Sequence, residues 1–254
     1  DCYQIGEFDR VRVKADALRI LRDDLARKVR PAFIGMGAMS DPYNPFEEKL
    51  ELTRHSLELI DAYDCGVTVA TKSDLIVRDI DILTAIQSHS PVICKITITT
   101  TDDTLAAKVE PHAPAPSRRL AALEKLSEAG LFAGVLLMPV LPFLEDSDEN
   151  VLSVVEGAAK AGARFIYPAL GVTMRQGQRE YFLDGLERAF PGRGLKERYL
   201  RQYGDRYQCA SPRARALWKV FSQTCRERGI LYDMKSIVRA ATLGYGDRQL
   251  TFFD

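Results

Sequence analysis

Apolar residues in the first two thirds of the chain alternate between short continuous runs and stripes with a helical period. The runs are rich in β-branched residues and end at Gly, Pro or polar residues, which is typical of buried strands. The stripes place an apolar residue every three or four positions, which predicts helices packed on one side of a sheet. Strands are expected at 10–13, 31–37, 66–71, 91–99, 131–140 and 163–171, and helices at 14–28, 48–63, 79–89, 116–130 and 147–162.

End signals support the last two of these helices. The fourth helix has Pro116 early, where a missing N–H costs little, and Gly130 at its stop. The fifth has Ser147 or Asp148 as its N-cap and closes on Gly162.

Strand and helix alternate about six times, so an α/β fold with parallel strands and outer helices is expected. Six units are too few for a closed eight-stranded barrel, and either a partial barrel or a doubly wound sheet fits. In both architectures, ligands bind at the carboxyl ends of the strands. The residues expected there include Ser40, Asp41, Tyr43, Thr71, Lys72, Ser73, Thr97, Thr99, Glu110, His112, Met138 and Pro139.

The exit of the second expected strand, "GMGAMSDPYNP" at 35–45, has an unusual composition. Its small residues let another group approach the backbone closely, and its two prolines stiffen the segment that follows. The alternative is a plain Pro-rich turn. Lys72, directly after the next strand, either reaches a ligand or extends to solvent.

Composition narrows the class of protein. The chain has 254 residues, 46% of them hydrophobic, which suits one large domain with a substantial core. It has no apolar run long enough to cross a bilayer, so no membrane association is expected. Five cysteines without a C-x2-C pair indicate a reduced, cytoplasmic protein. Because the first residue is Asp1 and no signal peptide is recognisable, we expect the chain to begin inside a longer protein.

Charge divides the chain near residue 170. Basic and acidic residues balance overall, but residues 171–254 carry 16 Lys and Arg against 9 Asp and Glu. We therefore expect a barrel core at 1–170 and a basic, mainly helical region at 171–254. Aromatic residues interleaved with arginines there fit either a nucleic-acid face or a packed helical cap with solvated arginines. These residues are Tyr199, Tyr203, Tyr207 and Trp218, with Arg198, Arg201, Arg206, Arg213 and Arg215.

The cysteines and histidines of the chain do not form a recognisable metal-binding motif. Cys209 and Cys225 are expected to be buried thiols. The three histidines, His55, His89 and His112, show no metal-binding spacing.

Four segments resemble one known family. They are "SDPYNP" after a Gly-rich strand, "VATKSDLIVRDIDIL", "KITITTTDDTLAAKVEPHAPAPSRRLAALEKLSEAG" and "LLMPVLP". In order and spacing they resemble the radical S-adenosylmethionine (SAM) proteins of the spore photoproduct lyase-like group, over roughly residues 10–170. The resemblance implies a partial (β/α)6 TIM-like barrel, here with a C-terminal helical extension.

The resemblance also implies two cofactors, SAM and a 4Fe-4S cluster. In the family the cluster sits on three cysteines of a C-x3-C-x2-C loop, and a reductant such as flavodoxin or ferredoxin supplies the electron that cleaves SAM. This chain has no such triplet, so the cluster cysteines are expected upstream of Asp1, with Cys2 as a bystander. A homologue that has lost the cluster is the alternative.

A SAM site follows residue by residue from the resemblance. Ser40 and Lys72 match residues that contact SAM, and a lysine suits its carboxylate or ribose hydroxyls. Thr97 matches a serine near the ribose, and Met138 matches a residue whose backbone meets the adenine. The cofactor-binding residues expected are Gly35, Gly37, Ser40, Asp41, Lys72, Thr97, Thr99 and Met138; no catalytic residue is assigned.

Ala38 stands where spore photoproduct lyase has a hydrogen-donor cysteine. Alanine cannot donate a hydrogen atom to a product radical, so spore photoproduct is not the expected substrate. The substrate stays open, with DNA as a candidate on resemblance alone. Two other interpretations remain: a cluster-less barrel that acts as a nucleic-acid-associated binding module, and an ordinary barrel enzyme with an anionic substrate.

The final residues suggest a partner. Gln249, Leu250, Thr251, Phe252 and Phe253 resemble the short motif by which bacterial repair proteins dock on the sliding clamp. The alternative is that both phenylalanines fold back onto the barrel.

Overall fold

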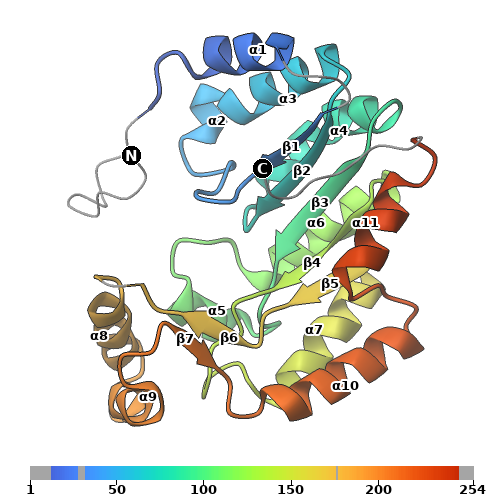
Figure 1. Cartoon of the computed structure of the whole chain (residues 1–254). Helices are drawn as coiled ribbons and strands as arrows, with labels where there is room; N and C mark the ends of the chain where they lie inside the picture. The colour runs from blue at the N-terminus through green and yellow to red at the C-terminus, as the bar shows by residue number, and fades with distance from the viewer. Residues whose placement is uncertain (1–12, 28–31, 176, 246–254) are drawn as a thin grey trace.

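The centre of the computed structural model, which describes residues 13–27, 32–175 and 177–245, is a sheet of five parallel strands. The strands follow one another in the sheet in the order of the sequence, as the path of the ribbon in Figure 1 shows. Helical segments connect them, which is the connectivity of a βα barrel. The strands are β1 (Phe33–Met36), β2 (Gly66–Thr71), β3 (Val92–Thr97), β4 (Ala133–Leu137) and β5 (Phe165–Pro168).

Helices cover one face of this sheet, which we call the outer face (Figure 1). Successive strand residues point to opposite faces, so every second residue of a strand enters this layer. Val67, Cys94 and Val135 do so and are completely buried against helix residues. The covering helices are α3 (Leu52–Ala62), α4 (Ile80–Gln87), α6 (Pro116–Glu128) and α7 (Asp148–Lys160), with α1 (Ala17–Arg27) packed beside α3.

The opposite, inner face is covered at its amino end by α11 (Met234–Thr242). Ile237 and Ala241 of this helix pack with Ile93 of β3 and Phe165 of β5. These four residues are buried and form a cluster separate from the outer-face core. The inner face is therefore apolar near the amino ends of the strands.

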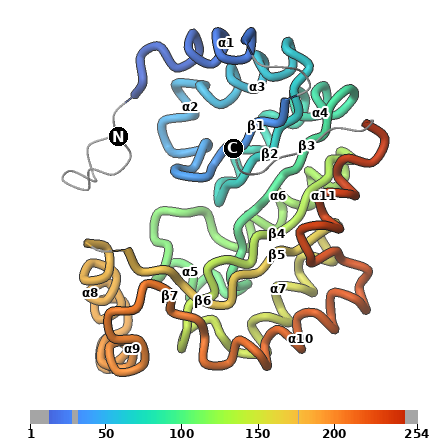
Figure 2. Tube along the Cα trace, viewed as in Figure 1, coloured from blue at the N-terminus to red at the C-terminus, as the bar shows by residue number. Residues whose placement is uncertain are grey.

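The remaining C-terminal elements fall into two groups, visible in the tube of Figure 2. The first is a small unit beside the carboxyl ends of the strands, in which α8 and α9 pack over a two-stranded antiparallel sheet. The second is α10, which packs on α7 and places Leu217, Phe221 and Cys225 in the outer-face core. The bounds are β6 (Gly171–Thr173), α8 (Arg179–Ala189), α9 (Leu195–Tyr203), β7 (Gln208–Ala210) and α10 (Ala214–Glu227).

The fold class expected from the sequence is confirmed. Five of the six expected strands are present, and 10–12 of the first expected strand lie outside the described residues. Ser147 is the N-cap of α7, because its hydroxyl accepts a hydrogen bond from the Asn150 N–H at 3.1 Å. Pro116 opens α6 as expected. The region beyond residue 170 is mainly helical.

One expected helix is interrupted. The segment 48–63 forms α2 (Glu47–Leu50) and α3, with Glu51 between them in the left-handed conformation at φ 48°. The Glu47 carboxylate accepts the Thr53 N–H at 3.0 Å and so caps α3. This cap satisfies a donor that a continuous helix would have bonded internally, and periodicity could not reveal it.

Three further helical segments were not expected as such. They are a 3-10 helix, η1 (Asp74–Asp79), before α4; α5 (Asp103–Val109) after β3; and α11. Within the described residues, no helix is both long and apolar enough to cross a membrane.

Candidate functional site

The loop after β1 leaves the strand through a position that requires glycine. Gly37 has φ 92°, and a Cβ there would lie 2.1 Å from the carbonyl oxygen of Ala70 in β2. Any side chain would collide with that backbone, so the loop runs tightly against the end of β2. Gly35 is different: a Cβ there would meet the Thr68 methyl at 3.9 Å, an ordinary contact.

Asp41 fastens this loop to the end of β2. Its Oδ1 accepts the Thr71 hydroxyl at 2.6 Å and the Tyr43 N–H at 2.9 Å, while its Oδ2 accepts the Lys72 N–H at 2.8 Å. The carboxylate is thus engaged by three donors of the chain itself. Its role here is to position Lys72 and the loop relative to one another.

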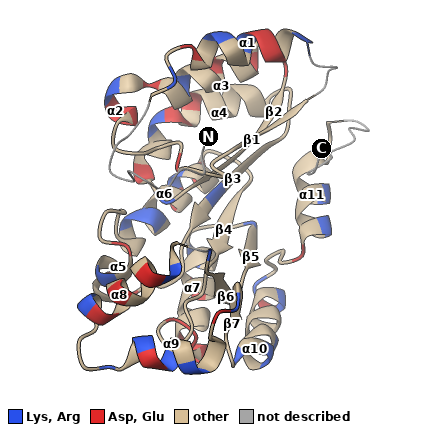
Figure 3. Cartoon of the chain, turned by 60° about the vertical axis from the view of Figure 1, so that its left-hand side comes forward, with Lys and Arg blue, Asp and Glu red and all other residues tan. Residues whose placement is uncertain are grey.

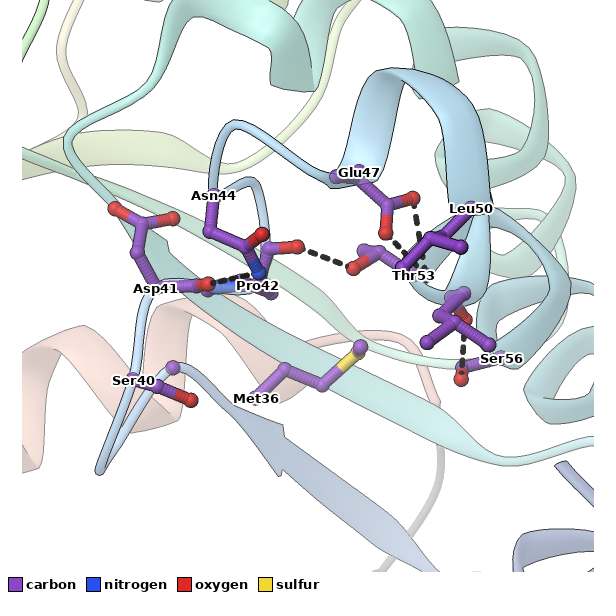
Figure 4. Close-up of a pocket in the computed structure, with 11 residues that line it drawn as sticks. Met36, Ser40, Asp41, Pro42, Asn44, Glu47, Leu50, Thr53 and Ser56 are labelled. Atoms are coloured by element: carbon purple, nitrogen blue, oxygen red, sulfur yellow. Dashed lines mark hydrogen bonds between the residues drawn. The ribbon is translucent and has the colours of Figure 1, made fainter. Parts of the chain in front are cut away.

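A cavity of about 270 Å³ lies between the loop and helices α2 and α3 (Figure 4). Ser40 and Gly37 line the loop side, and Glu47, Leu50 and Ser56 line the helix side. Figure 4 shows the Thr53 hydroxyl reaching the Pro42 carbonyl, at 2.5 Å, across one wall. The cavity sits at the edge of the sheet, at the carboxyl end of β1.

A charged cluster lies at the carboxyl ends of β2 and β3, the region we call the mouth. The ammonium of Lys72 forms an ion pair with Glu110 Oε1, and Arg119 Nη2 lies 2.6 Å from Glu110 Oε2. Arg119 is 1% exposed and also donates to the carbonyls of Thr97 at 3.0 Å and Pro114 at 2.7 Å. One carboxylate therefore orients two cations, and one of those cations holds the end of β3.

Electrostatics in this cluster favour the ionised carboxylate. Burial alone would raise the pKa of Glu110, but the charges of Lys72 and Arg119 outweigh it and hold that pKa below its usual value. The Lys72 side chain is 38% exposed.

A second polar group lies at the ends of β3 and β4. Glu145 Oε1 accepts the Thr99 hydroxyl at 2.7 Å and Oε2 accepts the Leu141 N–H at 2.8 Å. Asn150 donates at 2.8 Å to the carbonyls of both Thr99 and Glu145. Glu145 is 1% exposed, and burial raises its pKa to about 7 despite these neutral donors.

The structure brings several expected site residues to one region and leaves others apart. Lys72 and Thr97 meet through the Glu110–Arg119 pair, and Gly37 and Asp41 position the loop beside them. The remaining four expected residues lie around this group. Ser40 is exposed in the edge cavity, and Gly35 is on the inner face of β1. Thr99 is hydrogen-bonded to Glu145, and Met138 precedes a cis Pro139.

Two residues of the mouth were missed as candidates from the sequence. Glu145 falls in a segment after the expected strand, and Arg119 falls in an expected helix beside another arginine. The signal in the sequence is Lys72, since a partly buried lysine needs a carboxylate nearby. Glu110, expected near a strand end, is that carboxylate, and Arg119 is its second partner.

No metal centre is formed by the described residues: no three His, Cys, Asp or Glu side chains among them are grouped to hold an ion. Cys65, Cys94, Cys209 and Cys225 are all buried. Cys209 and Cys225 are buried, as expected, and burial raises the pKa of both thiols, that of Cys225 to about 12. His55 contacts Glu58 and His89 contacts Asp61.

The four aromatic residues that alternate with arginines beyond residue 170 are of two kinds, two buried and two exposed. Tyr199 and Tyr203 are 1% and 5% exposed in the core of α8 and α9, and the Tyr199 hydroxyl donates to the Pro142 carbonyl at 2.9 Å. These two cannot stack on nucleic-acid bases, which corrects that part of the expectation. Tyr207 and Trp218 are exposed. Lys and Arg are spread over α8 to α11 and alternate with acidic residues on α8 and α9 (Figure 3).

The chain has relatives of similar sequence in distant organisms. It is 31% identical over 199 residues to uncharacterized proteins of Mycobacterium bovis and Mycobacterium tuberculosis, an alignment that covers 78% of this chain and 58% of theirs. An uncharacterized protein of Methanocaldococcus jannaschii is 31% identical over 134 residues, 53% of this chain and 48% of that protein. The chain thus spans less than two thirds of the curated relatives it matches. No family model matches it.

Solved structures with the same fold include two named proteins. Spore photoproduct lyase in complex with dinucleoside spore photoproduct has a TM-score of 0.61 at 16% identity, over 85% of this chain and 65% of the lyase. SuiB of Streptococcus suis bound to S-adenosylmethionine has a TM-score of 0.54 at 14% identity, over 89% of this chain and 45% of SuiB. At these identities the likeness shows a shared fold.

Proposed function

We propose that this chain is the SAM-binding barrel of a radical SAM enzyme. The observation that carries the proposal is the agreement of two independent lines. The segments that resemble the radical SAM family end at one mouth of the sheet, and the whole sheet has the fold of spore photoproduct lyase and SuiB, both solved with SAM bound.

The residues of the mouth fit the polar parts of SAM. Lys72 offers an ammonium that suits a carboxylate. Glu110 pairs with this ammonium, and Asp41 fixes the Lys72 backbone by accepting its N–H. Gly37 lets the loop run tightly against the end of β2, which keeps Asp41 beside Lys72. When bound and reductively cleaved, SAM supplies a 5′-deoxyadenosyl radical. This chain's residues bind SAM and orient it toward the substrate.

The described residues do not fit the 4Fe-4S cluster. Their four cysteines are buried and separate, and no grouping of metal ligands occurs among them. We therefore assign the cluster cysteines to the part of the relatives' length that this chain does not span, together with contact to a reductant such as flavodoxin or ferredoxin. The second candidate function, a cluster-less binding module, is favoured by the same lack of ligands within the described residues.

DNA is the proposed substrate class, on the resemblance to spore photoproduct lyase. Because Ala38 replaces the donor cysteine, spore photoproduct itself is excluded from the proposal. The clamp-like motif Gln249–Phe253 lies outside the described residues, and contact with a sliding clamp remains a proposal from the sequence.

The test separates the two candidates in two steps. First, SAM and S-adenosylhomocysteine are titrated calorimetrically into this chain; the proposal expects binding, and a chain that binds neither contradicts it. Second, the full-length protein is reconstituted anaerobically with iron and sulfide, reduced, and assayed for 5′-deoxyadenosine. Formation of 5′-deoxyadenosine supports the enzyme; SAM binding without cleavage in the full-length protein supports the cluster-less module.

A further inference from the structure

Lys95 of β3 is a charged residue on the inner face of the sheet, away from the charged cluster at the mouth. Val92, Cys94 and Ile96 of β3 face the helices of the outer face. The strand alternates, so Ile93, Lys95 and Thr97 face the inner side, and Ile93 does contact α11 there. Lys95 therefore lies one row above Ile93 and one row below Thr97, in the row that Gly134 of β4 and the buried Phe165 of β5 continue.

The neighbours of Lys95 leave it without a charge partner. In the sheet it lies between Ala70 of β2 and Gly134 of β4, two small residues. Among the residues that the five described strands turn to the inner face, it is the one with a charged side chain. No described residue forms an ion pair or hydrogen bond with its ammonium. Lys72 is different, since Glu110 neutralises it.

A second polar group on the same face lacks a partner. Thr68 of β2 is 5% exposed, and its hydroxyl is buried with no hydrogen-bond partner among the described residues. Its strand neighbours Val67 and Val69 enter the outer-face core, so Thr68 faces inward. It is opposite Ile93, and Ala70, two residues later, is opposite Lys95. The two groups are thus diagonal neighbours on adjacent strands.

Both groups cost the protein stability as they stand. A buried hydroxyl without a partner loses its hydrogen bond to water, and a largely buried lysine loses hydration of its charge. Burial accordingly lowers the pKa of Lys95. Each cost is removed by one kind of ligand, a group that accepts hydrogen bonds and carries negative charge.

We propose that Lys95 and Thr68 bind an oxyanion of the substrate, a carboxylate or phosphate group, on the inner face below the SAM site. Lys95 supplies the positive charge and Thr68 donates a hydrogen bond. The inference adds one chemical feature, an anionic group, to the substrate of the proposed enzyme, and it rests on the proposed function only in calling this ligand a substrate. The binding site itself does not require SAM cleavage, because neither group belongs to the mouth cluster.

The experiment uses NMR of the chain with isotope-labelled lysine, and the Lys95 signal is assigned by its loss in Lys95→Met. Inorganic phosphate and acetate are the probes. We expect Lys95 to titrate below the other lysines, and either anion to raise its pKa because the anion stabilises the ammonium. A tighter response to phosphate than to acetate assigns a phosphorylated substrate, and the reverse assigns a carboxylate.

Variants separate a binding role from a structural one. Lys95→Met should weaken phosphate binding by about tenfold or more, and Thr68→Val by about fivefold. Neither should lower the stability of the free protein, because each removes an unsatisfied buried group. Lys160→Met, which removes an exposed lysine of α7, is the matched control and should change neither property.

Three results would overturn the proposal. The first is a Lys95 signal that does not respond to either anion. The second is equal phosphate binding in Lys95→Met and Lys160→Met. The third is competition between S-adenosylhomocysteine and phosphate for the Lys95 signal, which would make Lys95 part of the SAM site. Phosphate binding at Lys95 in a protein that never cleaves SAM would instead refute the proposed enzyme and retain the oxyanion site.

Discussion

Two glutamates at the carboxyl ends of the strands, Glu110 at 14% and Glu145 at 1% exposed, meet opposite electrostatic surroundings. Glu110 lies between Lys72 and Arg119, and its pKa is lowered. Glu145 is bonded by the Thr99 hydroxyl and the Leu141 N–H, and its pKa is raised to about 7. Hydrogen bonds from neutral donors therefore do not cancel the rise in the pKa of Glu145 that burial causes. The two cations beside Glu110 do cancel the corresponding rise there. One end of the mouth holds a fixed charge and the other holds a group that titrates near neutrality.

The largest expected effect comes from removing the buried cation. Arg119→Met deletes the ion pair to Glu110 and the donors to the carbonyls of Thr97 and Pro114. We expect the free energy of unfolding to fall by about 3–5 kcal/mol, because a largely buried carboxylate loses one of its two cationic partners and two carbonyls lose their donors. Urea denaturation measures it. The neighbouring Arg118→Met is the control: Arg118 is 66% exposed and pairs with Asp74, so its loss should cost less than about 1 kcal/mol. Equal losses would refute the buried pair.

The second prediction uses pH to separate the two glutamates. The folded pKa of Glu145 lies above its unfolded value, so its contribution to stability is present in acid and is lost as pH rises through about 7. A shift from 4.5 to about 7 corresponds to roughly 3 kcal/mol. Glu145→Gln should abolish this loss and make the protein relatively more stable above pH 7.

Glu110→Gln should behave in the opposite way. The pKa of Glu110 is lowered on folding, so its contribution is present above the unfolded pKa and is lost as pH falls through the folded pKa. The variant should therefore be destabilised at neutral pH and should approach the wild-type protein in acid. Unfolding curves at several pH values measure both variants, and parallel pH profiles would contradict the contrast.

A smaller effect is expected from the neutral donor. Thr99→Val removes the hydroxyl bonded to Glu145 and should cost about 1–2 kcal/mol, more above pH 7 than below it, because the ionised carboxylate needs the donor more. Thr101→Val is the control, since the Thr101 hydroxyl bonds Ser153 rather than a carboxylate. A cost at Thr99 that is independent of pH would show that Glu145 does not titrate there.

The smallest effect on stability is expected at Lys72. Because the side chain is 38% exposed, Lys72→Met should cost less than about 1 kcal/mol of stability. Under the proposed function it should still weaken SAM binding by about tenfold, measured by calorimetry. Lys125→Met, on the exposed side of α6, should leave SAM affinity unchanged. Unchanged affinity in Lys72→Met would remove Lys72 from the SAM site.

The sequence predicted the scaffold of the mouth better than its charges. Apolar runs located five strands, and 66–71 agrees with β2 at both ends. Alternation in "PVICKITIT" also places the side chain of Lys95 on the other face of the strand from Cys94 and Ile96, in agreement with the structure. Periodicity could not separate Arg118 from Arg119, although one is exposed and the other buried. The burial of Arg119 depends on Glu110, which approaches it from a loop nine residues earlier, and only tertiary structure creates that pair.

The place of α10 in the outer-face core has a consequence for how the protein is made. That single core includes Leu25 near the start of the described chain and Phe221, Cys225 and Ile230 near its end. A ribosome must therefore release the chain through Ile230 before this core can be complete. Until then the apolar side of α7 lacks its cover, so a nascent chain stopped before residue 214 exposes surface that invites aggregation or chaperone binding.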